Sequence, residues 1–157
     1  MKFDALALIR TGCFGDIRVG SSPQDVQQNL GVPDAVSQES PPEIWRYGNV
    51  QIILNPVVVL VVIQLRKSSK GWHPSIELSG WIPQRNMNLF DFETTLDAAH
   101  IDLHPDPDLT FDEQENFFLG ASGVSALFVN EVLDRMTLSS RHASETQAHW
   151  QAKDVRR

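Results

Sequence analysis

The sequence predicts an α+β protein made of two similar units, in which short helices pack on an antiparallel sheet that can continue from one unit into the other. Three observations predict this class. Short runs with apolar residues at helical spacing occur beside runs rich in β-branched and aromatic residues. Glycine, asparagine and proline turn signals separate the strand-like runs. The same order of elements, a helix, a proline-containing loop and then strands, occurs twice along the chain.

Two short helices are expected at the start of the first half. Three apolar residues at three-residue spacing would share one face of the first helix: Phe3, Leu6 and Ile9. Residues 17–19, which lie between glycines, then predict a short strand. The second helix is expected after Ser22, which can cap its N-terminus, and before Gly31, which can end it. Val26 and Leu30, four residues apart, are expected on its buried face.

The stretch EIWRYGNVQIIL, residues 43–54, predicts a β-hairpin. Side chains alternate along a strand, so Trp45 and Tyr47 point to the same side of the first strand. Gly48 and Asn49 tolerate positive φ and form the two-residue turn. We expect Trp45 and Tyr47 to pack against a helix rather than to form part of a working site.

Two further strands are expected in the first half. After a turn at Asn55-Pro56, residues 57–65 contain β-branched side chains that are continuous rather than alternating, so both faces of this strand are expected to be covered. Residues 66–71 form a polar turn. Residues 72–82 predict a fourth strand, interrupted near Pro74.

The second half repeats this order. A helix is expected over residues 88–99, with Leu89, Phe92 and Leu96 at spacings of three and four. After it we expect a loop with two prolines at residues 100–108 and a turn-linked pair of strands at residues 109–120. Two more strands are expected at residues 123–130 and 131–138.

Laying one half over the other indicates a structural duplication. Val26 and Leu30 fall on Phe92 and Leu96 at an offset of 66 residues, and Ile63 and Leu65 fall on Met136 and Leu138 at an offset of 73. The division that follows is a first unit at residues 1–85, a second, acidic unit at residues 86–138 and a polar tail at residues 139–157. Ser144 and Gln147 in the tail have the spacing of a capping box, and Trp150 could dock a short helix.

Composition excludes several classes of protein. The single cysteine, Cys13, excludes an internal disulfide and a cysteine-based zinc site. A net charge of −7 argues against nucleic acid as a direct ligand. The N-terminal stretch ends in small residues before Cys13, as a bacterial lipoprotein signal does, but Asp4 and Arg10 interrupt its apolar run and disfavour that reading. The longest apolar stretch is too short to span a bilayer as a helix, so we expect a cytoplasmic protein with no membrane contact.

The negative charge is concentrated in the second half. Residues 1–85 contain eight Lys and Arg and seven Asp and Glu, whereas residues 86–138 contain one Arg and eleven Asp and Glu. A stretch of one sign can steer a basic protein partner toward it, although a solvated acidic face is the simpler alternative. The residues expected to contact the partner are Asp102, Asp106, Asp108, Asp112, Glu113, Glu115, Trp72 and Trp81.

No pattern of residues predicts catalysis, a cofactor or a metal. His100 and His104 have the four-residue spacing that can share a metal on a helix, but Pro105 biases His104 away from helical geometry. Nearby carboxylates could act as an acid–base pair, yet nothing in the sequence signals the burial that would tune them. The glycine-rich residues 12–20 lack the Lys of a phosphate-binding P-loop. A small metal-dependent or hydrolytic enzyme built on residues 100–112 is therefore the alternative rather than the prediction.

The stretch VGSSPQDVQQNLGVPDAV, followed by IWRYGNVQIIL, resembles a known small unit. It is similar to the α+β unit shared by the small outer-membrane assembly lipoproteins and the beta-lactamase inhibitor proteins, over residues 17–65 and more faintly over 86–138. The resemblance implies helices on one face of an antiparallel sheet and a binding function without catalysis. In size and charge the chain also resembles bacterial immunity proteins, which neutralise toxins. An immunity or inhibitor protein is the function expected, and a structural or assembly protein of the cell envelope is a further alternative.

Overall fold

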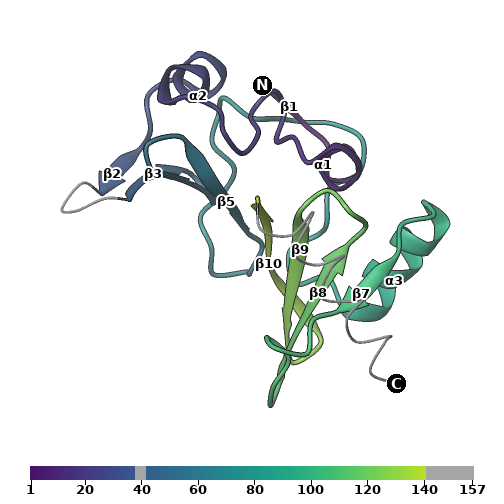
Figure 1. Cartoon of the computed structure of the whole chain (residues 1–157). Helices are drawn as coiled ribbons and strands as arrows, with labels where there is room; N and C mark the ends of the chain where they lie inside the picture. The colour runs from purple at the N-terminus through teal and green to yellow at the C-terminus, as the bar shows by residue number, and fades with distance from the viewer. Residues whose placement is uncertain (38–41, 141–157) are drawn as a thin grey trace.

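A computed structural model describes residues 1–37 and 42–140, which form three helices and ten strands (Figure 1). Eight strands make one sheet with antiparallel pairing throughout, and the other two form a small parallel sheet. The helices are α1 (Ala5–Thr11), α2 (Pro23–Leu30) and α3 (Leu89–Ala98). The predicted α+β class is confirmed.

The large sheet contains the strands in the order β2, β3, β4, β5, β10, β9, β8 and β7 from edge to edge. From the first half come β2 (Ala35–Ser37), β3 (Glu43–Tyr47), β4 (Val50–Leu54) and β5 (Val58–Gln64). From the second half come β7 (Leu103–Pro105), β8 (Gln114–Leu119), β9 (Val124–Val129) and β10 (Val132–Ser139). Each half is therefore a meander, and the two halves meet where β5 pairs with β10.

The register of β5 on β10 has a local two-fold symmetry. Ile63 lies directly opposite Met136, and these two residues are equivalent positions of the two halves at the offset of 73 residues. The offset also relates Val61 to Asp134 and Leu65 to Leu138. The pair of Val61 with Leu138 therefore has a symmetric counterpart in Leu65 with Asp134. Both contacts are present, because Val61 lies opposite Leu138 and the Leu65 amide donates to the Asp134 carbonyl. This register is compatible with a duplication. The division at residues 85 and 138 stays a prediction.

The first helix begins at Ala5, two residues later than its apolar spacing from Phe3 indicated. Asp4 Oδ1 accepts the Leu6 amide and caps α1, because an aspartate serves better as an N-cap than inside a helix. Phe3 therefore lies in β1 (Lys2–Phe3), which pairs with β6 (Glu77–Leu78), and the predicted helical face is wrong. The strand predicted at residues 17–19 is also wrong, because only an isolated bridge joins Phe14 and Ile17. The residues of α1 that are buried are Ala5, Leu8 and Ile9.

The second and third helices have the caps and buried faces that their sequences indicate. In α2, Ser22 Oγ accepts the Asp25 amide while Asp25 accepts the Ser22 amide, which is a complete capping box. Asn88 caps α3 in the same way by accepting the Asp91 amide. Four of the five residues that the sequence placed on the inner faces of the two helices are buried, namely Val26, Leu30, Phe92 and Leu96, whereas Leu89 is partly buried against the core.

The hairpin of β3 and β4 is confirmed as a structural element. Trp45 is 7% exposed and Tyr47 is fully buried. The Tyr47 hydroxyl donates to the Gly31 carbonyl at 2.9 Å, which ties the hairpin to the end of α2. In the turn, Gly48 has a φ of +58°, and a Cβ there would lie 2.3 Å from the Gly71 carbonyl oxygen. Only glycine fits this position.

Two strands at the edges of the sheet were not predicted. Residues 72–82 do not supply the fourth strand of the first half; only β6 forms there, and it pairs with β1. The fourth strand is β2, whose three exposed residues show no alternation in the sequence. In the second half, β7 lies in the loop predicted at residues 100–108. Proline is tolerated in β7 because an edge strand has one side without ladder hydrogen bonds. Residues 109–120 were predicted to form a turn-linked pair of strands, but they contain a single strand, β8, which follows a tight turn closed by the bridge between Phe111 and Gln114.

All three helices contribute to a single hydrophobic core on one face of the large sheet. The opposite face carries Arg46, Gln51, Val62, Gln64 and Arg135, which alternate with buried core residues along their strands. No helix of residues 1–37 and 42–140 covers this face, although Val62 on it is only 8% exposed and no residue of β5 is fully exposed, so the expectation that both faces of β5 are covered stays a prediction. We call it the uncovered face.

Two further findings concern the membrane and the C-terminal tail. Within the described residues, no helix has both the length and the apolar character needed to cross a membrane. The predicted capping box at Ser144 and the docking of Trp150 lie outside the described residues.

The burial of Trp45 generates a stability prediction. Trp45→Ala removes a large side chain from the core and should lower the free energy of unfolding by about 3–5 kcal/mol. Chemical denaturation followed by circular dichroism measures this change. The control is Arg46→Ala, an exposed neighbour on the uncovered face, which should change the free energy by less than about 0.5 kcal/mol. Equal stabilities for the two variants would contradict the structural role of Trp45.

Tyr47 generates a prediction about pH. Burial, with a smaller contribution from Asp34, raises the pKa of Tyr47 from 10.0 to about 12. The unfolded chain therefore loses this proton first, so the contribution of Tyr47 to stability is complete below pH 10 and is lost as the pH rises through 12. Tyr47 is the only tyrosine, so tyrosinate absorbance reports on it alone. A midpoint near 10 in the folded protein would contradict its burial.

Candidate functional site

The acidic stretch of the second half does not form one exposed group of carboxylates. Asp106 is only 6% exposed. Its Oδ1 accepts the Asp108 amide at 3.1 Å, and its Oδ2 accepts the Asn116 side-chain amide at 3.3 Å. An aspartate commonly closes a turn through the amide two residues later, and Asp106 does so after β7. The prediction that Asp106 contacts a partner from an exposed loop is therefore corrected, because its carboxylate is used inside the protein.

The other predicted carboxylates lie nearer the solvent. Asp102, Asp108, Asp112 and Glu113 are exposed, and Glu115 is half-buried in β8. The same loop exposes two apolar side chains, Leu109 at 49% and Phe111 at 55%. The loop between β7 and β8 therefore combines negative charge with apolar surface.

A second acidic surface lies along α3 and was not recognised in the sequence. Phe90, on the outer side of this helix, is 75% exposed. It contributes to two adjoining shallow hollows of about 380 and 480 Å³. The carboxylates that line them are Glu93, Asp97, Asp102 and Glu131. We call Phe90 and these four residues the α3 surface. The signal for it was present, because Phe90 falls off the helical face formed by Leu89, Phe92 and Leu96.

The two tryptophans predicted to contact a partner pack on the hydrophobic core. The ring centroid of Trp72 lies 5.4 Å from that of Phe3, and the ring centroid of Trp81 lies 5.9 Å from that of Phe92. Both side chains are half-buried. Their aromatic surface is therefore largely engaged within the protein.

The histidine pair does not have the geometry that its spacing suggested. His100 follows the end of α3 with a φ of +57°, whereas His104 lies on β7. The two residues therefore do not share a helical face. Across residues 1–37 and 42–140, no group of three His, Cys, Asp or Glu side chains is arranged to hold a metal ion.

The structure instead brings together a group of basic residues that are distant in the sequence. Arg46 on β3, Gln51 on β4, Gln64 on β5 and Arg135 on β10 lie on the uncovered face, with Arg46 paired to Gln51 and Gln64 paired to Arg135. The loop that follows β5 borders them. A pocket of about 410 Å³ is formed here, and we call it the basic pocket; it is lined by Arg46, Gly48, Asn49, Gln51, Gln64, Arg66, Ser68, Ser69, Lys70 and Arg135.

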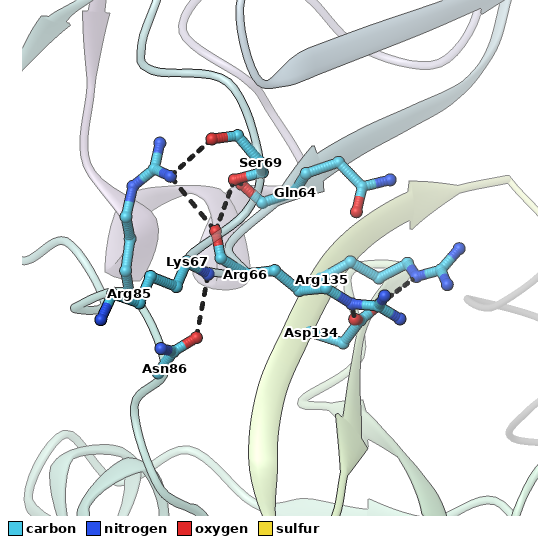
Figure 2. Close-up of polar contacts among 8 residues, drawn as sticks. All are labelled: Gln64, Arg66, Lys67, Ser69, Arg85, Asn86, Asp134 and Arg135. Atoms are coloured by element: carbon cyan, nitrogen blue, oxygen red, sulfur yellow. Dashed lines mark hydrogen bonds and ion pairs between the residues drawn. The ribbon is translucent and has the colours of Figure 1, made fainter.

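A buried carboxylate anchors two of the arginines. Asp134, 2% exposed, forms ion pairs with the Nε atoms of Arg66 and Arg135, the latter at 2.7 Å (Figure 2). On a regular strand Asp134 and Arg135 would point to opposite faces. The pairing of β10 with β9 shifts between Leu133 and Arg135, and this bulge allows the two neighbouring side chains to meet.

A third arginine fixes the loop beside the pocket. Arg85 donates through Nη1 to the carbonyls of Arg66 and Ser69, and through Nη2 to that of Lys70. Figure 2 shows Arg85 on one side of the loop and the side chains of Gln64, Arg66 and Arg135 extending to the other side. The loop carbonyls are thus satisfied by Arg85, while the basic side chains line the pocket.

Comparison with protein-family models, with curated proteins and with solved structures finds no match for this chain. The resemblance to the beta-lactamase inhibitor proteins and the outer-membrane lipoproteins therefore stays a prediction.

The anchoring role of Asp134 generates a prediction. Asp134→Asn leaves Arg66 and Arg135 without their buried counter-charge and should lower the free energy of unfolding by about 1–3 kcal/mol. The expected loss of free energy is smaller than for a fully buried ion pair because both arginines are partly exposed to solvent. The control Asp112→Asn makes the same substitution at an exposed position. Urea denaturation compares the two, and a stable Asp134→Asn variant would show that this carboxylate is not an anchor.

Proposed function

We propose that the protein is a non-enzymatic binding module that captures a basic protein partner, as an immunity or inhibitor protein does, and that it acts in the cytoplasm. The single observation that carries this proposal is the exposure of Phe90, at 75%, among the carboxylates of the α3 surface. A large aromatic side chain in such a position loses solvent contact only when a partner covers it. Aromatic side chains are also frequent energetic anchors of interfaces.

The charge of the second half supports a basic partner. No Lys or Arg occurs between Asn86 and Asp134, so the α3 surface and the loop between β7 and β8 both present carboxylates without neighbouring basic residues in the sequence. A field of one sign raises the rate of association with a partner of the opposite sign and disfavours partners of the same sign. In this proposal, Phe90 supplies the buried contact and the carboxylates supply steering and selectivity.

The enzymatic alternative has less support from the geometry. The predicted catalytic loop contributes a buried Asp106 whose two oxygens are engaged, and its two histidines lie on separate elements. The remaining carboxylates of the loop are exposed, which does not favour the tuned acid–base pair that hydrolysis requires.

The proposal predicts the chemistry of peptides that the protein selects. A random peptide library displayed on phage and selected against the purified protein should yield peptides that combine Lys or Arg with an apolar anchor. Peptides that carry no positive charge after selection would contradict the basic partner.

Variants tested with one selected peptide then separate the effect of the carboxylates on the association rate from the effect of Phe90 on the dissociation rate. Glu93→Gln/Asp97→Asn should slow association several-fold and flatten its salt dependence, while dissociation changes little. Phe90→Ala should instead speed dissociation about 10-fold, since anchor residues contribute more than 1 kcal/mol. The matched control Asp16→Asn/Glu77→Gln removes two exposed carboxylates in the first half and should leave both rates unchanged. Stopped-flow measurements at several salt concentrations would reject the proposal if the two double variants behaved alike.

A further inference from the structure

The basic pocket gathers a large share of the positive charge in the described part of the chain. Nine Lys and Arg residues fall within residues 1–37 and 42–140, and four of them line this pocket: Arg46, Arg66, Lys70 and Arg135. Within the described residues, Asp134 is the one carboxylate that forms an ion pair with a residue of its lining, and a second carboxylate, Asp34, accepts the backbone amide of the lining residue Gly48 at 2.7 Å. Four positive charges and one negative charge leave a net of three positive charges in a protein whose overall charge is −7. Like charges this close repel one another, so the fold alone gives no reason to gather them.

The arginines of the basic pocket are held in place yet keep hydrogen-bond donors for a ligand. Arg66 and Arg135 contact Asp134 through Nε, and their side chains remain 54% and 39% exposed. A guanidinium carries five N–H donors, so each arginine has further donors that can face the pocket. Arg85 fixes the loop that carries Arg66 and Lys70 through three carbonyl contacts. Side chains fixed before binding lose less entropy when a ligand arrives.

The remaining lining suits an anion rather than an apolar ligand. Gln51, Gln64, Ser68 and Ser69 contribute amide and hydroxyl groups that can donate hydrogen bonds. No Asp or Glu is among the lining residues, and the carboxylate that contacts its arginines, Asp134, is already engaged in ion pairs with them. A volume of about 410 Å³ lies near the lower end of the range for small-molecule sites. Within the described residues, neither Arg46 nor Lys70 forms an ion pair.

We infer that the basic pocket is a binding site for a phosphate group, either free phosphate or the phosphate of a small ester. A phosphate group carries about 1.5 to 2 negative charges at neutral pH and offers several acceptor oxygens, which match the excess of positive charge and the N–H donors of the arginines. A monocarboxylate offers one charge and two oxygens, and a dicarboxylate such as succinate separates its two charges along a carbon chain, so neither presents its charge and acceptor oxygens on one compact group as a phosphate does. Arg46, Lys70 and the outer donors of Arg66 and Arg135 would hold the phosphate, with Asp134 as the positioning residue. The inference is independent of the proposed protein partner, which the α3 surface would bind.

The test uses inorganic phosphate, glycerol phosphate and succinate as probes against the whole protein, in sodium chloride of matched ionic strength. Binding is followed by amide chemical shifts and by calorimetry. We expect saturable 1:1 binding of phosphate or its ester, with shifts centred on the lining residues, and binding of succinate at least 10-fold weaker. Tighter binding of glycerol phosphate than of phosphate would identify an ester as the natural ligand, and equal binding would identify free phosphate; both support the site.

Matched variants locate the binding. Arg46→Gln and Lys70→Gln are exposed substitutions without ion pairs in the described residues, so both variants should fold, and each should weaken phosphate binding about 10-fold. The control Arg18→Gln removes the same charge from an exposed position outside the pocket and should weaken binding less than two-fold. Absence of saturable binding would overturn the inference. So would equal losses in the Arg18 and Arg46 variants, or succinate binding as tightly as phosphate.

Discussion

The pairing of β5 with β10 is the constraint on which the rest of this structure depends. It is the one ladder of the large sheet that joins the two halves of the chain. On one side of this ladder, Ile63 and Met136 face each other in the buried core. On the other side, the ladder places Gln64 opposite Arg135 and brings the loop after β5 over the bulge at Asp134. The core, the continuity of the sheet and the basic pocket therefore all depend on the pairing of β5 with β10.

The one-sided layering of the fold determines where function can be located. Because the helices pack on a single face, the polar residues of the central strands remain on a face that no described helix covers. Charge is also divided along the sheet. The basic pocket is at the junction of the halves, whereas carboxylates and exposed aromatic side chains occupy the second half. Two surfaces of opposite sign can engage two different ligands without competing for the same residues.

Elements with strong local signals could be predicted from the sequence. The Ser22 N-cap, the Gly48 turn and the alternation of Trp45 with Arg46 are all encoded within a few residues, and each was predicted correctly. The edge strand β2 was missed because three exposed residues carry no hydrophobic pattern. The edge strand β7 was missed because its proline is a loop signal in most contexts. Both edges are defined by their neighbours in the sheet rather than by their own residues.

The candidate sites were harder to predict because they depend on the register between distant strands. Arg46 and Arg135 are separated by 89 positions, and only the order of strands brings them into one pocket. Burial of Asp106 likewise depends on Asn116, across the ladder of β7 and β8. Composition did reveal the acidic second half, but it could not show which carboxylates are used inside the protein.

Hydrogen exchange of the backbone amides tests the central role of the β5 and β10 pairing most directly. If this ladder unites the two halves, the amides of β5 and β10, including that of Leu65, should be the most protected and should open only with global unfolding. The edge strands β2 and β7 should exchange much faster. The account would be contradicted if β5 and β10 exchanged as fast as the edges, or if β5 and β10 opened with different free energies as parts of two separately unfolding halves.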